Sequence, residues 1–150
     1  NETGDLIAYS FFVQAPGGSL LLMDYFAVCR AYRNSGYGSE CLALMKALWQ
    51  GTGGILAEVE DPAKSSSAEE EHTRTRRVAF YQRNGMRPTQ VHSVLFGVPY
   101  ILHYLPVAGE CPDKQIYDEL DAIYRTLFPL PVYKAKAKIT LLESEAQAKK

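Results

Sequence analysis

The short segment Arg33-Asn34-Ser35-Gly36-Tyr37-Gly38 has the residue types of an anion-binding loop. It lies between an apolar run and an amphipathic stretch, where a strand is expected to turn into a helix. The two glycines permit backbone angles and close approaches that a side chain would forbid. A helix that begins just after them leaves N–H groups unpaired and adds a partial positive charge. The segment therefore predicts a cradle for an anion.

The elements on either side of this loop are those of a mixed α/β domain. Residues 5–13 and 19–28 predict two strands, and the second is apolar enough to be buried on both faces. Residues 39–50 carry apolar side chains at helical spacing, which predicts a helix with one face on a core. Residues 55–60 predict a third strand.

The second half of the chain predicts a polar loop, a helix and two further strands. Residues 61–73 are the most polar stretch and predict a loop that becomes helical near its end. The charged residues that follow predict a helix that ends at Gly85. Residues 89–96 and 97–106 then predict two strands joined by a turn.

The C-terminal part predicts one more helix and one more strand. Residues 112–127 place apolar side chains on one helical face. Residues 132–141 alternate in period two, with lysines on one side, which is typical of an edge strand. Residues 143–150 are expected to be frayed. The chain then divides into a core, residues 1–106, and a C-terminal helix and edge-strand extension, residues 107–150.

Several kinds of nucleotide-binding loop contain closely spaced glycines. The phosphate loop of NTPases requires Gly-Lys-Ser/Thr, whereas Ser39 and Glu40 follow the second glycine here. A dinucleotide fingerprint requires a third glycine or alanine where Cys41 stands, although Glu58 or Glu60 could supply its acidic residue. An ordinary strand-to-helix turn without a ligand stays open as well.

A third motif fits the loop better. The loop resembles the Arg/Gln-x-x-Gly-x-Gly/Ala signature of the GNAT acetyltransferase superfamily, with Arg33 at its first position. The segment "AFYQRNGM", residues 79–86, is similar to the Phe/Leu-Tyr-x-x-x-Gly-Phe/Met segment of the family's fourth helix. The resemblance covers residues 4–105. It implies a GNAT-like acyl-CoA N-acyltransferase fold, α/β with a mixed sheet, in which the family's N-terminal elements are expected to be missing.

This resemblance implies that the anion is the pyrophosphate of acetyl-CoA, the acetyl donor. Backbone N–H groups of the loop are then expected to point at the diphosphate. Main-chain groups of the preceding strand are expected to pair with the pantetheine amides, as an added strand would. The implied cofactor-binding residues are Phe26, Ala27, Val28, Arg33, Asn34, Ser35, Gly36, Tyr37, Gly38 and Ser39.

The resemblance also implies an N-acetyltransferase that transfers the acetyl group to a primary amine of a small molecule or peptide by direct attack. An alkyl amine is mostly protonated at neutral pH, so a base assists the attack. Glu58 and Glu60 are the candidate bases, with Glu58 preferred, and both could instead be solvated or pair with arginines of the next helix. Asp24 is a weaker candidate, because a carboxylate in an apolar strand has to be paired or face a cavity. Tyr81 matches the family's tyrosine that protonates the leaving thiolate; otherwise it is a core tyrosine.

The alternative function is a non-catalytic acyl-CoA-binding or sensory module. A net charge of -1 gives no reason to expect nucleic acid or an anionic membrane as partner. The longest apolar runs are too short to span a bilayer. Three cysteines without metal-type spacing predict no metal site and a reduced, cytoplasmic setting. The acceptor is unspecified, and many members of the family dimerise, so a homodimer is left open.

Overall fold

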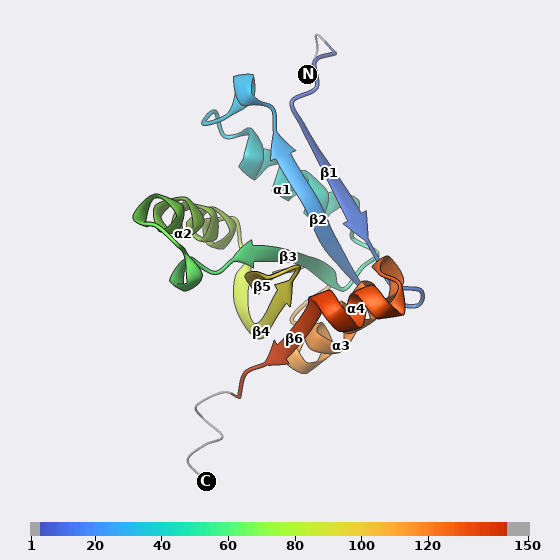
Figure 1. Ribbon diagram of the computed structural model, residues 1–150. Coiled ribbons are helices and arrows are strands. Elements are labelled where there is room, and N and C mark those ends of the chain that lie inside the picture. The colour runs from blue at the N-terminus through green and yellow to red at the C-terminus, as the bar shows by residue number, and fades with distance from the viewer. Residues whose placement is uncertain (1–3, 144–150) are drawn as a thin grey trace.

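The computed structural model describes residues 4–143, which form a mixed sheet with helices on both faces (Figure 1). The described strands, six in number, have the order β1-β2-β3-β5-β4-β6. Strands β2 and β3 are parallel, and the other neighbours are antiparallel. The mixed α/β sheet expected from the sequence is therefore confirmed. The elements are β1 (Ala8–Val13), β2 (Leu20–Val28), α1 (Tyr37–Leu48), β3 (Gly54–Glu60), α2 (Ala68–Arg83), β4 (Arg87–Leu95), β5 (Val98–Pro106), α3 (Asp113–Leu127), α4 (Leu130–Lys136) and β6 (Ala137–Leu141).

Two hydrophobic cores lie on the two faces of the sheet, because successive side chains of a strand point to opposite sides. Helices α1 and α2 cover one face, where Leu42 packs with Ile55 and Ala57 of β3. Helix α3 covers the other face, where Ile116 packs in a core with Leu56 of β3. The C-terminal helix and strand thus pack on the sheet of their own chain.

The polar stretch after β3 becomes helical at Ala68 because its residues cap one another. The Ser67 hydroxyl oxygen accepts a hydrogen bond from the Glu70 N–H at 3.2 Å. The Glu70 carboxylate in turn accepts one from the Ser66 N–H at 2.6 Å. Such reciprocal capping satisfies N–H groups that the first turn of a helix leaves unpaired. The loop that becomes helical near its end is thus confirmed.

The alternation predicted one strand over residues 132–141, and this prediction is wrong. Helix α4 occupies the first half, and only β6 is an edge strand, paired with β4. Pro129 caps α4, and a second proline lies in its first turn, where the missing N–H does no harm. The Tyr133 ring lies under the Arg125 guanidinium of α3, 4.4 Å from its carbon, which fixes α4 against α3. Of the tail that was expected to fray, residues 144–150 lie outside the described residues.

Candidate active site

Strands β2 and β3 separate toward their carboxyl ends, which opens the sheet (Figure 1). Their pairing begins at Leu20 and ends at Met23, which lies opposite Ala57. Strand β2 nevertheless continues to Val28, and β3 continues to Glu60. Beyond Met23, the main chain of β2 therefore has a strand partner only on its β1 side within the described sheet. An extended ligand could pair with the other side.

A β-bulge in β2 lies at the point where the strands separate. Tyr25 is opposite Phe11, but Met23 is opposite Phe12, so Asp24 is the extra residue. A bulge of this kind bends its strand and increases the local twist. The Asp24 side chain is exposed and makes no ion pair with a described residue. Its charge acts on the nearby Glu58 carboxyl group. Strand β2 is fully buried only up to Met23, not over its whole length.

The backbone of the glycine loop changes handedness twice before α1 begins. Asn34 has a φ of 62° and Gly36 a φ of 87°, whereas Ser35 between them stays on the negative side. Alternating handedness is the arrangement that turns successive N–H groups toward one concave side. A side chain at Gly36 would meet no atom within 4 Å, so its φ is the reason for a glycine there.

Five successive N–H groups of this loop have no acceptor among residues 4–143. Among the described residues, no hydrogen bond is donated by the main-chain N–H of residues 34–38. The Ser39 N–H differs, because it donates to the Gly36 carbonyl at 2.9 Å. Ser39, which was expected to contribute its N–H to the cradle, therefore has that group engaged. The free donors lie at the N-terminus of a 12-residue helix, whose dipole favours negative charge.

The second glycine serves packing between the two motifs. A Cβ at Gly38 would lie 3.1 Å from Cζ of Phe80 in α2 and 3.7 Å from Cγ2 of Val28 in β2. A side chain at this position would therefore require the Phe80 ring of the "AFYQRNGM" segment to give way by a few tenths of an ångström. The glycine pattern predicted access for an anion at this position, and the structure adds a close contact with α2. The two motifs are neighbours in space.

The predicted cofactor residues of β2 lie on the separated part of the strand. Phe26, Ala27 and Val28 pair with β1 on one side and have no strand on the other. The Val28 carbonyl is nevertheless engaged, because it accepts a hydrogen bond from Nε of Arg33 at 3.0 Å. Arg33 is exposed and makes no ion pair with a described residue. Its positive charge therefore stays available at the mouth of the opening between β2 and β3.

Tyr81 lies on the α1 and α2 face, beside the opening. Its side chain is buried in the core that contains Ala57, and burial raises the pKa of the phenol. Its hydroxyl group makes no hydrogen bond with a described residue and is not one of the fully buried polar atoms that lack a partner. The hydroxyl group therefore keeps some contact with solvent, and a donor with a high pKa stays protonated at neutral pH.

Glu58 points to the opposite face, toward α3. The hydroxyl group of Tyr124 in α3 donates to its Oε1, and the Ser93 hydroxyl group of β4 donates to the same oxygen at 2.9 Å. Burial raises the pKa of the Glu58 carboxyl group, while these two hydrogen bonds oppose the rise and the nearby Asp24 adds to it. A carboxylate with a raised pKa is a better proton acceptor than a solvated one.

Glu60 is an ion-pair partner of α2, which was one of the two alternatives for the pair of glutamates. Its carboxylate lies 3.0 Å from Nε of Arg74 and 3.8 Å from a terminal nitrogen of Arg77. Arg74 is buried and also binds the Glu70 carboxylate at 2.6 Å. Two guanidinium groups therefore pair with the Glu60 carboxylate, whereas Glu58 has no such partner among the described residues.

Sequence reasoning missed three polar residues around the opening. Tyr124 stood in the apolar stripe of a helix and was read as core, and Ser93 stood in a strand without any motif. His103 of β5 is buried with its ring 6.5 Å from that of Tyr81, and its Nε2 atom has no hydrogen-bond partner among residues 4–143. Burial lowers the pKa of His103, so it is neutral at neutral pH. Only the pairing of distant strands brings these side chains together, and no local signal reports it.

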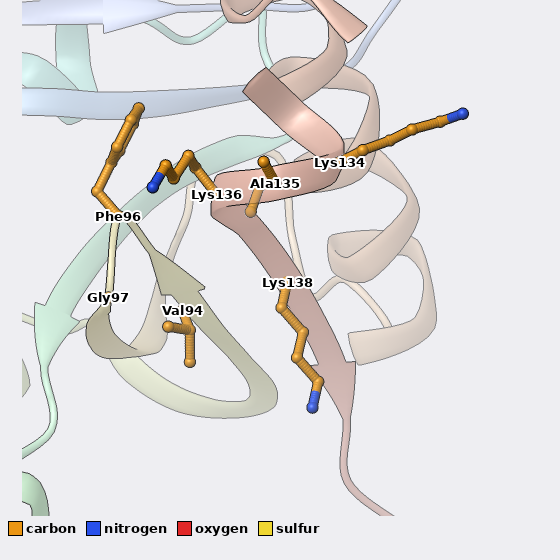
Figure 2. A pocket seen from close by; sticks show the side chains of 8 residues that line it. Val94, Phe96, Gly97, Lys134, Ala135, Lys136 and Lys138 are labelled. Atoms are coloured by element: carbon orange, nitrogen blue, oxygen red, sulfur yellow. The ribbon is translucent and has the colours of Figure 1, made fainter. Parts of the chain in front are cut away.

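A cavity elsewhere in the described chain does not contribute to this site. A cavity of 480 Å³ lies between the β4–β5 turn and α4, lined by Phe96 and three lysines, and contains none of the predicted site residues. Figure 2 shows that the side chains of Lys134 and Lys138 diverge from it, so the lysines do not converge on one ligand. Residues 4–143 contain no group of three or more potential metal ligands. None of their helices has the length and apolar character needed to cross a bilayer.

Solved structures with a similar fold are acetyltransferases. A GNAT-family acetyltransferase of Bacteroides thetaiotaomicron superposes with a TM-score of 0.59 at 21% identity, over 80% of this chain and 64% of that one. The ribosomal-protein-S18-alanine N-acetyltransferase of Escherichia coli superposes with a TM-score of 0.52 at 16% identity, over 74% of this chain and 68% of that one. A Bacillus subtilis acetyltransferase in complex with CoA superposes with a TM-score of 0.50 at 15% identity, over 69% of this chain and 70% of that one. No family model matches the chain, and no curated protein matches its sequence.

These likenesses define the fold. The chain has the fold of the GNAT acetyltransferases, as the two sequence motifs implied. It spans 64% of the length of the Bacteroides structure and 68% of the E. coli one, so about a third of each relative has no counterpart in the superposition.

Proposed function

We propose that the chain is an acetyl-CoA-dependent N-acetyltransferase that acts on a primary amine. The observation that carries the proposal is the row of five N–H groups, residues 34–38, that have no acceptor in the described protein at the start of α1. They lie in the segment that joins the open end of β2 to α1. The fold supports the same conclusion, since one structure that shares it was solved with CoA bound.

Each part of acetyl-CoA has a matching group in the protein. The diphosphate would accept hydrogen bonds from the N–H groups of residues 34–38, with Arg33 supplying positive charge. The pantetheine arm would enter between β2 and β3 and pair with the free main-chain side of residues 26–28, as an added strand pairs with a sheet edge. The Val28 carbonyl would become available to it once Arg33 turns toward the phosphates.

The chemistry needs one proton acceptor and one proton donor. The amine nitrogen would attack the thioester carbonyl carbon, and its proton would pass to Glu58 directly or through water. The N–C bond would form and the C–S bond break. The departing thiolate would take the proton of the Tyr81 hydroxyl group. General acid and base catalysis each contribute about 10²- to 10⁴-fold in such reactions.

The acceptor class comprises small-molecule amines and peptide amino termini. The E. coli protein with the same fold is named for an alanine amino terminus, so a peptide that begins with alanine belongs in the first panel of acceptors. The cytoplasmic location inferred from the cysteine content stays a prediction.

The test is acetyl transfer measured as thiol release, corrected for hydrolysis, with a panel of amines and amino-terminal peptides. The proposal expects turnover with at least one acceptor and its loss in Glu58→Gln, with acetyl-CoA binding retained. Micromolar binding of acetyl-CoA without turnover of any acceptor would favour the sensory module instead. A chain that binds no acetyl-CoA would contradict both functions.

A further inference from the structure

Two side chains from two other elements donate hydrogen bonds to one oxygen atom of Glu58. Tyr124 of α3 donates a hydrogen bond to Oε1, and Ser93 of β4 donates another at 2.9 Å. The Tyr124 and Ser93 hydroxyl oxygens are themselves 3.1 Å apart. Tyr124 is fully buried and Ser93 is 3% exposed, so water does not compete for these bonds. No hydrogen bond of a described residue reaches Oε2 of Glu58.

We propose that Tyr124 and Ser93 are positioning residues that hold Glu58 by Oε1, so that Oε2 is the oxygen that takes the proton of the acceptor amine. This inference rests on the proposed function for the identity of the proton. Its structural part, the fixed carboxylate, rests on the contacts alone.

The count of hydrogen atoms explains the assignment of the two oxygens. The hydroxyl groups of Tyr124 and Ser93 carry one hydrogen each, and the ionised Glu58 carboxylate can accept a hydrogen bond from both. The third close contact, between the two hydroxyl oxygens, then carries no hydrogen. With two donors on Oε1, that atom has no free position for an incoming proton. When Oε2 takes the proton, Oε1 becomes a carbonyl oxygen that still accepts both hydrogen bonds, so the network survives the transfer.

The groups around Glu58 set how strongly it holds a proton. Burial raises the pKa of the carboxyl group most, and the charge of Asp24 in β2 adds to the rise. Burial raises the pKa of the Tyr100 phenol in β5, and the charge of the nearby Glu58 carboxylate raises it further. Against these, the two hydrogen bonds from Tyr124 and Ser93 stabilise the ionised form. Removing either donor is therefore expected to make Glu58 harder to ionise.

Tyr124 connects helix α3 to Glu58 through its hydrogen bond. It lies beyond residues 4–105, which carry the family resemblance, and its ring is 6.1 Å from that of Phe128 at the end of α3. Phe128 in turn contacts Phe96 of the β4–β5 turn at 5.5 Å. Helix α3 thus links Glu58 to the turn between β4 and β5 through aromatic contacts.

The test compares Tyr124→Phe with a matched control, Tyr133→Phe. Both substitutions remove a phenol hydroxyl group that donates to a carboxylate, because Tyr133 donates to Asp121. Two measurements are made: a ¹³C NMR titration of the Glu58 side-chain carboxyl group, and the pH profile of kcat/KM with the best acceptor. Ser93→Ala is a second variant in case Tyr124→Phe does not fold.

The proposal expects Tyr124→Phe to raise the pKa of Glu58 and to move the acidic limb of kcat/KM to higher pH. At pH values below that limb, kcat/KM of the variant should be about tenfold or more below the wild-type value, because the ionised carboxylate has lost one hydrogen bond. Ser93→Ala should shift both in the same direction, and Tyr133→Phe should shift neither. The proposal is overturned if the titration of Glu58 is the same in wild type and in both Tyr124→Phe and Ser93→Ala, or if Tyr133→Phe moves it equally.

Failure of the proposed function would look different. A wild-type chain that transfers no acetyl group overturns the transferase and, with it, the assignment of Oε2 as the proton acceptor. The NMR titration needs no turnover, so it still decides whether Tyr124 and Ser93 hold the Glu58 carboxylate.

Discussion

The Tyr81 ring and the Glu58 carboxylate lie on opposite faces of the sheet, with strand β3 between them. Tyr81 packs with Ala57 and Val59, whereas Glu58 turns to Tyr124 on the α3 side. A thioester held between β2 and β3 would therefore meet a proton donor from one face and a proton acceptor from the other. The proton of the amine and the proton for the departing thiolate would then be transferred on different faces of the sheet.

Glu58→Gln is expected to lower kcat by about 10²-fold or more, because the amide cannot take a proton from the amine. The dissociation constant of acetyl-CoA should not change, since Glu58 lies away from the glycine loop. Steady-state kinetics and calorimetry on the same preparation give both numbers. A variant with more than a third of the wild-type kcat would remove Glu58 from the mechanism.

The same substitution should change the pH dependence of stability. The folded state raises the pKa of Glu58, so its ionised form is disfavoured relative to the unfolded chain. Stability is then highest below the unfolded pKa and falls as pH rises through the folded pKa. Urea unfolding from pH 4 to 8 should show a smaller decline for Glu58→Gln than for wild type. An unchanged decline would mean that Glu58 titrates as it does in the unfolded chain.

Tyr81→Phe tests the proton donor. We expect kcat to fall by about 10²-fold while the affinity for acetyl-CoA is kept, because only the hydroxyl group is lost and the ring still packs beside Phe80. Burial raises the pKa of Tyr81, so wild-type activity should not decline from its ionisation near neutral pH. Full activity of the variant with a good amine acceptor would make Tyr81 a core residue only.

Gly36→Ala tests the loop, with Gly17→Ala as its matched control. Both glycines have positive φ, 87° and 74°, and a side chain at either would meet open space. Each substitution should cost about 1–2 kcal/mol of stability through backbone strain. Only Gly36→Ala should also weaken acetyl-CoA binding, by about tenfold or more, or about 1.4 kcal/mol. Equal affinities in the two variants would mean that the loop does not hold the cofactor.

Arg74→Met should destabilise the fold by about 1–3 kcal/mol, because it leaves the Asp61 carbonyl and the Glu60 carboxylate with fewer donors. Arg76→Met is the control on the same helix, since Arg76 is exposed and makes no ion pair with a described residue. Chemical denaturation at pH 7 measures both. Similar midpoints for the two variants would show that the buried guanidinium contributes little.

Local sequence patterns predicted most of the elements and the two motifs, because helix periodicity and glycine loops are properties of short segments. They failed for residues 132–141, where an alternating pattern fits a strand and also a short helix begun by prolines. They also did not predict the bulge at Asp24, because a bulge depends on the register with β1.

The candidate site shows the same limit. Arg33, the loop glycines and Tyr81 could be found by their spacing, and Glu58 by its place in a strand. The hydroxyl groups of Tyr124 and Ser93 could not, because their contact with Glu58 joins residues 66 and 35 positions away in the chain. The reason for Gly38 also needed the structure, since it depends on where Phe80 packs.

Amide NMR with a ¹⁵N-labelled chain and acetyl-CoA tests the central claim most directly. The account predicts that the N–H signals of residues 34–38 shift on titration and saturate together, with the Gly17 signal unmoved. Saturable binding of acetyl-CoA that leaves those five signals in place would contradict it.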